Sequence, residues 1–151
     1  MGVPVNSLAS PRFCGVRTFQ RLPHSADCSG NDFAVLGVPF DTATSYRPGC
    51  RFGPAAIRHE SYGLETYSPY QNADLTDFDI FDSGDLELCF GSSESALADI
   101  QSRAAEILHD GKFPLLLGGE HLVTLGAVRA MVEKYPDLHI VHFDAHADLR
   151  D

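Results

Sequence analysis

The stretch Phe113-Pro114-Leu115-Leu116-Leu117-Gly118-Gly119 decides the fold class. Its apolar residues follow one another without alternation, which predicts a strand buried on both faces, as in a parallel sheet. A helical pattern follows over residues 121–134, with a predicted inner stripe of Leu125, Val128 and Val132, and Pro136 ends it. Residues 138–143 then form a second predicted buried strand. A strand, a helix and a strand in this order indicate an α/β domain with a parallel sheet.

The sequence before this stretch repeats the alternation. Residues 33–38 form a short apolar run that predicts a strand, and Pro54 marks the start of a predicted helix over 55–62. Residues 63–77 are polar and predict a loop, and residues 78–81 predict a short strand. A clearer helix is predicted from Ser93 until Gly111 stops it, with one apolar face made of Leu97, Ile100, Ala104, Ile107 and Leu108.

The two ends of the chain have their own character. Residues 1–32 are irregular and rich in proline and small polar residues, so we predict an amino-terminal arm that lies over the domain or over a neighbouring subunit, with residues 33–151 as the domain itself. The chain stops at Asp151, directly after a predicted strand, where a covering helix normally follows in a parallel sheet. We therefore expect the domain to be truncated.

Composition excludes several classes of function. A hydrophobic fraction of 44% and a charged fraction of 21% are those of a soluble globular protein, and no apolar run has the length of a membrane span. Without a secretory signal, we expect a cytoplasmic protein whose four cysteines are reduced. A formal charge of -10 disfavours binding to nucleic acid or anionic membranes and weakly favours a cationic small molecule.

The strongest chemical signal is the run Asp144-Ala145-His146-Ala147-Asp148, directly after the predicted strand 138–143. In an extended backbone, alternate side chains project to one side, so two carboxylates and an imidazole converge. Adjacent carboxylates repel each other unless a cation lies between them. Mixed Asp and His ligands suit manganese, zinc or iron better than calcium. Since ligands of open α/β sheets bind at the carboxyl ends of strands, a metal site is favoured over a solvated acidic turn.

A second signal is Gly118-Gly119-Glu120-His121, at the end of the other predicted strand. Alone, His121 would be a capping or core histidine, but the neighbouring acidic run makes it the fourth predicted ligand. Glu120 is predicted to orient a ligand or a water by hydrogen bonding. His142 is predicted to be a packed strand histidine. The remaining histidines have no clustered partners and are predicted to be surface or structural residues: His24, His59, His109 and His139.

The third signal is the long connection from Gly37 to Arg58, which leaves the first predicted strand at the same edge of the sheet. Long ordered loops at this edge often line a site. A structural loop held by salt bridges of Arg47, Arg51 and Arg58, or a subunit contact, explains the same residues equally well. The sequence leaves both interpretations open.

Together these three stretches resemble the ureohydrolases, the arginase and agmatinase family. Gly118-Gly119-Glu120-His121 resembles the first metal motif of that family, with Glu in place of the usual Asp, and His142-Phe143-Asp144-Ala145-His146-Ala147-Asp148 resembles the second. The loop from Gly37 to Arg58 and the stretch Ser10-Pro11-Arg12-Phe13 resemble the agmatinase type. The resemblance implies the amino-terminal half of a three-layer α/β/α arginase-like fold.

The resemblance also implies a ligand set and a reaction. His121, Asp144 and Asp148 would bind one Mn2+, and Asp144 would bridge to a second Mn2+ that His146 also binds, giving two ions in a complete site. Such a centre supports hydrolysis of a small cationic guanidinium substrate, with agmatine giving urea and putrescine, a step of polyamine biosynthesis. The catalytic acid and base are unknown, because the proton donors of the family fall beyond Asp151.

Other functions stay open at this point. A guanidinobutyrase, an arginase or a formimidoylglutamase would carry the same metal motifs. A different class is a non-catalytic metal-binding or assembly fragment. We expect the 151-residue chain to bind one metal weakly and to have little activity by itself. We expect its full-length parent to be a homo-oligomer.

Overall fold

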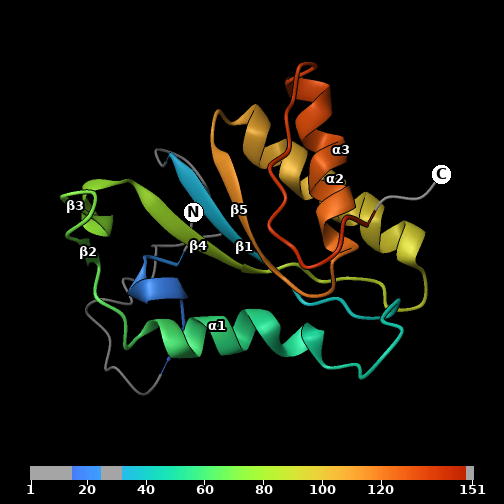
Figure 1. Ribbon diagram of the computed structural model, residues 1–151, viewed down its shortest axis with the longest axis horizontal. Coiled ribbons are helices and arrows are strands. Elements are labelled where there is room, and N and C mark those ends of the chain that lie inside the picture. Colours follow the sequence, from blue (N-terminus) through green and yellow to red (C-terminus); the bar gives the residue numbers. More distant parts are fainter. Residues whose placement is uncertain (1–14, 25–31, 149–151) are drawn as a thin grey trace.

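The computed structural model describes residues 15–24 and 32–148 (Figure 1). Its three longer strands are β1 (Phe33–Val38), β4 (Ile80–Asp85) and β5 (Phe113–Gly118), and its α-helices are α1 (Gly53–Ser61), α2 (Ser93–His109) and α3 (Val123–Lys134). A small hairpin pairs β2 (Tyr67–Ser68) with β3 (Ala73–Asp74). Three short 3-10 helices complete the list: η1 (Phe19–Arg21), η2 (Cys50–Phe52) and η3 (Leu75–Asp77).

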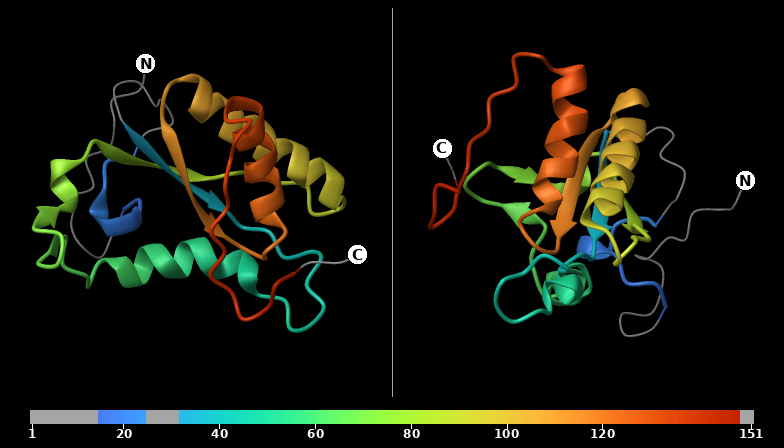
Figure 2. Two further views of the ribbon diagram at one scale, coloured as in Figure 1. Left: turned by 45° about the horizontal axis from the view of Figure 1, so that its top comes forward. Right: turned by 90° about the vertical axis from the view of Figure 1, so that its right-hand side faces the viewer.

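The longer strands form a parallel sheet in the order β4-β1-β5. Phe33 is in register with Ile80 on one side and with Phe113 on the other. Helix α1 covers one face of the sheet, and α2 with α3 covers the opposite face (Figures 1 and 2). This arrangement confirms the three-layer α/β/α fold class. Since the strands are parallel, the carboxyl ends of β1 and β5 meet at one edge of the sheet.

Helix α2 follows its prediction closely. Ser92 caps its amino terminus by accepting a hydrogen bond from the Ser95 amide at 3.2 Å. All five residues of the predicted apolar face are buried. Ile100 and Ile107 join the main core with Leu36, Phe40 and Phe81. The helix therefore fixes one side of the sheet through side chains that its period identifies in advance.

Helix α3 shows a different inner face from the predicted one. Leu125 and Val132 are exposed, and the buried residues are Val123, Gly126 and Ala130. A Cβ atom at Gly126 would lie 2.7 Å from Cγ2 of Ile100, so the glycine allows α2 and α3 to approach closely. The predicted inner stripe was wrong at Leu125 and Val132, while Val128 is half-buried. Small residues make the contact with α2, and a periodicity of apolar residues does not take their size into account.

The predicted strand over residues 138–143 does not form. The segment runs back beside α3 and makes no sheet ladder among the residues described (Figure 1). Its apolar side chains are open to solvent, with Val141 at 77% and Phe143 at 94% exposure. A strand needs a neighbour for its backbone N–H and C=O groups, but this segment does not pair with the free edge of β5 in the described residues.

The same lack of a neighbour changes β5. Phe113 and Leu115 are exposed, so the strand is covered on one face only rather than on both. In the described residues β5 pairs with β1 alone and is an edge strand. Residues 78–81 also differ, since their strand, β4, begins two residues later at Ile80 and extends to Asp85. The loop predicted over 63–77 contains the small hairpin and η3.

The described part of the amino-terminal arm, residues 15–24, lies on the domain. The Phe19 amide donates to Oδ2 of Asp82 at 2.7 Å, and the Gln20 amide donates to Oγ of Ser61 at 2.8 Å. His24 forms a parallel bridge with Asp82 at the outer side of β4. The rest of the predicted arm lies outside the described residues. No helix in the described ranges has the length and apolar character needed to cross a membrane.

A buried ion-pair network joins α1 to β4. Nε of Arg58 donates to Oδ2 of Asp82 at 2.7 Å, and Nη1 pairs with Asp85. Burial alone would lower the pKa of Arg58, but the hydrogen bonds to Asp82 and Asp85 outweigh it and raise the pKa. A Cβ atom at Gly37 would overlap the Asp85 carboxylate, so only glycine leaves room for this pair. The network therefore holds the end of the connection that follows β1, at Arg58, against β4.

Candidate metal centre

The turn after β5 presents the first candidate ligand. Gly119 has a positive φ of 87°, and a Cβ atom there would overlap the Val38 carbonyl oxygen, so the position requires glycine. The predicted helix start at His121 is two residues early, because residues 120–122 form a tighter turn before α3. The Thr124 amide donates to the His121 carbonyl at 3.0 Å within this turn. His121 is therefore placed at the carboxyl edge of the sheet.

The acidic run is bent rather than extended. The His146 amide donates to Oδ1 of Asp144 at 2.9 Å, which closes a turn inside the motif. Asp148 has a positive φ of 51°, which redirects its side chain. The alternation expected of an extended backbone therefore fails here, and convergence of the side chains comes from the bend.

Four side chains converge at this edge: His121, His142, Asp144 and Asp148. One donor atom from each lies within 4.8 Å of the others. Nε2 of His121 is 3.2 Å from Oδ2 of Asp148, and Nε2 of His142 is 3.6 Å from Oδ2 of Asp144. The structure thus brings together three of the four predicted ligands from two separate segments.

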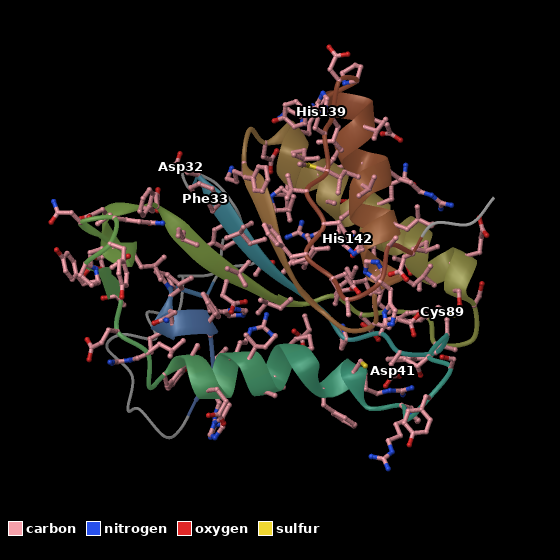
Figure 3. All side chains as sticks on the ribbon, viewed as in Figure 1. Asp32, Phe33, Asp41, Cys89, His139 and His142 are labelled. Atoms are coloured by element: carbon pink, nitrogen blue, oxygen red, sulfur yellow. The ribbon has the colours of Figure 1, made fainter. Side chains whose placement is uncertain are left out.

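His142 and His146 both differ from their predicted roles. His146 lies outside the group of four, with 83% of its side chain exposed, although its Nδ1 is 3.7 Å from Oδ1 of Asp144. His142, labelled in Figure 3, belongs to the group. Its ring stacks on that of His121 with centroids 5.2 Å apart. The prediction of a packed strand histidine was wrong because the strand that would pack it does not form.

Electrostatics at the centre favour ionised Asp144. The hydrogen bond from the His146 amide lowers the pKa of Asp144, partial burial opposes this, and the neighbouring imidazoles of His142 and His121 lower it further. A carboxylate that stays ionised without a bound cation is ready to accept one. The donor set of two imidazoles and two carboxylates matches a transition metal such as Mn2+ or Zn2+ better than Ca2+.

The spacing of the donors is slightly wider than a bound ion requires. Donor atoms about 2.1 Å from a common ion lie at most about 4.2 Å apart. The observed limit of 4.8 Å is slightly wider, so the four side chains need to contract by a few tenths of an ångström. Among the described residues this is the one group of His, Cys, Asp and Glu with such spacing. His24, His59, His109 and His139 lie outside it, as predicted.

Glu120 has a different partner from the predicted one. It is buried, with 7% exposure, and its Oε2 accepts a hydrogen bond from the Ala43 amide at 2.9 Å. Its Oε1 is buried without a hydrogen-bond partner among the described residues. Glu120 therefore contacts the connection after β1, whereas the sequence predicted a hydrogen bond to a ligand or a water.

The connection from Gly37 to Arg58 combines both interpretations that its sequence allowed. Arg51 pairs with Asp41, and Arg58 pairs with Asp82, so two of its three arginines are structural. Arg47 is exposed, with its guanidinium carbon 5.2 Å from the Tyr46 ring centroid. The connection nevertheless begins at the carboxyl end of β1 and touches Glu120, so it also lies beside the metal centre.

Asp41 anchors this connection. The side chain of Arg51 donates to Asp41 and lowers its pKa, burial opposes the shift, and the amides of Gly49 and Arg51 lower it further. The Gly49 amide lies 2.6 Å from Oδ2 of Asp41. Cys50, in this connection, and Cys89, labelled in Figure 3, are free thiols. Cys14 and Cys28 lie outside the described residues.

Comparison with known proteins places these motifs in a family. The model of the arginase family matches residues 31–151. The agmatinase of Bacillus subtilis is 53% identical over 119 residues, which are 79% of this chain and 41% of that protein. The proclavaminate amidinohydrolase of Streptomyces clavuligerus is 40% identical over 147 residues, which are 95% of this chain and 46% of that protein. The chain thus spans less than half the length of these curated relatives.

Solved structures agree with the fold. The structure of the Streptomyces clavuligerus enzyme superposes with a TM-score of 0.84 at 39% identity, over 92% of this chain and 46% of that one. A formiminoglutamase variant of Trypanosoma cruzi, solved with Mn2+, superposes with a TM-score of 0.64 at 27% identity, over 73% of this chain and 38% of that one. These likenesses confirm an arginase-like fold for the part of the chain they cover.

Proposed function

The chain belongs to the arginase family, and from this we propose that the protein is an agmatinase-like hydrolase that uses manganese to release urea from agmatine. The observation that carries the proposal is the convergence of His121 with Asp144 and Asp148 at the carboxyl edge of the sheet. The 53% identity to an agmatinase supports the choice of substrate. The products would be urea and putrescine.

We propose specific ligands within the centre. His121, Asp144 and Asp148 would hold one Mn2+, and Asp144 and His146 would contribute to holding a second. The side chain of His146 is exposed beside Asp144, which leaves it able to turn toward a second ion. His142 stacks on His121 and holds its ring in one orientation. A single ion bound by all four grouped side chains, His142 included, is the competing assignment.

The chemistry follows from the inertness of the guanidinium carbon, whose resonance makes it a poor electrophile. A manganese centre, when bound, lowers the pKa of water and supplies a nucleophile at neutral pH. The residues of this chain contribute orientation and charge. Asp144 and Asp148 supply negative charge toward the cationic substrate, and the acidic chain as a whole, with a formal charge of -10, favours its approach.

A second candidate is hydrolysis of a guanidino compound with a different tail. The match to proclavaminate amidinohydrolase covers 95% of this chain, including most of the amino-terminal arm, whereas the match to the agmatinase covers 79%. The greater sequence identity to the agmatinase favours agmatine as the substrate. The greater coverage of this chain by the match to proclavaminate amidinohydrolase favours the other substrate class. The motifs of the metal centre are compatible with both. A metal-binding module without catalysis remains the alternative from a different class.

The test combines metal analysis with a substrate panel. The protein, expressed to the full length of its reading frame, is loaded with Mn2+, and urea release is measured with agmatine, 4-guanidinobutanoate, arginine and proclavaminate precursors bearing a guanidino group. We expect the greatest kcat/KM with agmatine and no turnover by Asp144→Asn. Urea release that persists in Asp144→Asn would contradict the proposed centre. Metal binding without turnover on any substrate would favour the non-catalytic module.

A further inference from the structure

Glu120 links two parts of the molecule that are far apart in sequence. Its Oε2 accepts the Ala43 amide at 2.9 Å, and its backbone amide donates to the Phe40 carbonyl at 2.7 Å. Both bonds join the turn after β5 to the start of the connection after β1. Glu120 is 7% exposed and Ala43 is exposed, so the bond between them is partly buried. The residue next in sequence is His121.

The segment held by Glu120 is a closed loop, residues 41–49, which we call the wall loop. Asp41 fixes its far end, since Oδ2 of Asp41 accepts the Gly49 amide at 2.6 Å. Thr44 adds a hydrogen bond from Oγ1 to the Asp41 carbonyl at 2.9 Å. Between these anchors the tip is exposed, and Tyr46 has 77% of its surface accessible. Asp41 thus holds the loop from within and Glu120 holds it from outside, and Oγ1 of Thr42 also donates to the Phe90 carbonyl at 3.3 Å.

We propose that Glu120 is a positioning residue that couples the wall loop to the metal centre. The inference rests on the proposed function, because it takes His121 as a manganese ligand. A closed wall loop fixes the turn that carries His121, so closure strengthens metal binding. Thermodynamic linkage requires the reverse as well: bound metal closes the loop by the same factor. A purely structural Glu120 would change stability without this reciprocity.

The tether itself is tested without metal. Amide exchange of the 151-residue chain is followed by NMR for Ala43, whose amide Glu120 accepts, and for Gly49, whose amide Asp41 accepts. We expect Glu120→Ala to speed exchange at Ala43 by about 10-fold, the effect of losing one hydrogen bond, and to leave Gly49 unchanged. Glu120→Gln keeps an acceptor oxygen and should preserve protection. Unchanged exchange at Ala43 in Glu120→Ala would overturn the tether.

The coupling is tested with Mn2+ alone as the probe. Mn2+ affinity is measured by electron paramagnetic resonance for the parent chain, Glu120→Ala, Glu120→Gln and the control Glu87→Ala, whose side chain is on an exposed position elsewhere. We expect Glu120→Ala to weaken binding by about 10-fold, as loss of outer-shell support does, with Glu120→Gln and Glu87→Ala close to the parent. Equal affinities of the parent chain and Glu120→Ala would overturn the coupling alone.

The effect of Mn2+ on the wall loop is measured in the unsubstituted chain, so this test does not depend on a variant that folds. Exchange of a peptide spanning the wall loop is followed by mass spectrometry in the unsubstituted chain, with and without Mn2+. We expect Mn2+ to slow its exchange by a factor similar to the affinity lost in Glu120→Ala. Binding of Mn2+ with no change in the wall loop overturns the coupling. A parent chain that binds no Mn2+ overturns the coupling and the proposed ligands together, while Ala43 exchange still reports the tether.

Discussion

Single side chains of the metal centre should control Mn2+ binding without controlling folding, because all four are solvent-exposed and outside the core. We expect His121→Ala and Asp148→Asn each to weaken Mn2+ binding by more than about 10-fold while thermal unfolding changes little. The matched control is His139→Ala, since His139 lies near the far end of α3 (Figure 3). Calorimetric titration measures the affinities. Binding unchanged in both ligand variants would contradict the assignment.

The lowered pKa of Asp41 gives the fold a defined pH dependence. A group whose folded pKa lies below its ordinary value of 3.8 contributes stability at higher pH and loses it as pH falls through the folded pKa. The stability difference between the parent and Asp41→Asn should therefore be constant from neutral pH to about pH 5 and shrink below that. Urea unfolding across this range measures it, with exposed Asp137→Asn as control. A difference independent of pH would contradict the ion pair with Arg51.

At the candidate site the sequence predicted part of the group that the structure brings together, while His146, from the same motif, lies outside that group. His121, Asp144 and Asp148 were predicted to converge, and they do. His142 was missed, although it continues the alternation from Asp144 and Asp148 by two residues toward the amino terminus. Its exposure depends on residues 138–143 having no strand partner, which the local sequence does not encode. The hydrogen bond from the Ala43 amide to Glu120 was also missed, because the two residues are 77 positions apart in the sequence.

At the scale of elements, the contact between α2 and α3 depends on the absence of a side chain at Gly126. A Cβ atom there would lie 2.7 Å from Cγ2 of Ile100 and 3.1 Å from the Leu97 carbonyl oxygen. Overpacking costs about 1–3 kcal/mol, and the gain in helix propensity of about 1 kcal/mol offsets part of it. We expect Gly126→Ala to lower the free energy of unfolding in urea, whereas Thr124→Ala on the exposed side should not. A more stable Gly126→Ala variant would contradict the close contact.

The start of α2 offers a second test at this scale. Ser92 caps the helix through the Ser95 amide, and Ser93 is the first helical residue. We expect Ser92→Ala to cost about 1 kcal/mol of stability, because the amide loses its acceptor. Ser93→Ala, one residue away, should be close to neutral. Equal effects of the two substitutions in urea unfolding would show that the cap contributes nothing.

A helix or strand could be predicted when its own sequence carries the apolar face that it buries. The strand Phe33–Val38 and the helix Ser93–His109 match their predictions, because each carries its apolar face in its own sequence. The inner face of α3 was mispredicted, since periodicity cannot tell a close contact through Gly126 and Ala130 from a bulky one. Residues 138–143 have the composition of a strand, but pairing is a property of two segments and this one has no described partner.

At the scale of the whole molecule, apolar surface gathers around the open edge of the sheet. Leu115 on β5 is exposed, as are Ile140, Val141 and Phe143 in the neighbouring part of the chain. An edge strand with exposed apolar residues promotes association. We expect the 151-residue chain to self-associate as its concentration rises, and Leu115→Lys to reduce this in sedimentation velocity. Tyr70→Lys, in the distant hairpin loop, should have no effect. A monomer at all concentrations would contradict this expectation.

The position of β1 in the middle of the sheet has a consequence for biosynthesis. Both of its neighbours, β4 and β5, follow it in the chain, and β5 begins only at Phe113. At about 5–20 residues per second, a ribosome needs roughly 4–16 s to deliver β5 after β1. Throughout that interval the apolar strand Phe33–Val38 remains unpaired on the side that β5 later occupies. A nascent chain stalled before residue 113 should therefore be held by chaperones, and one extended past α3 should be released.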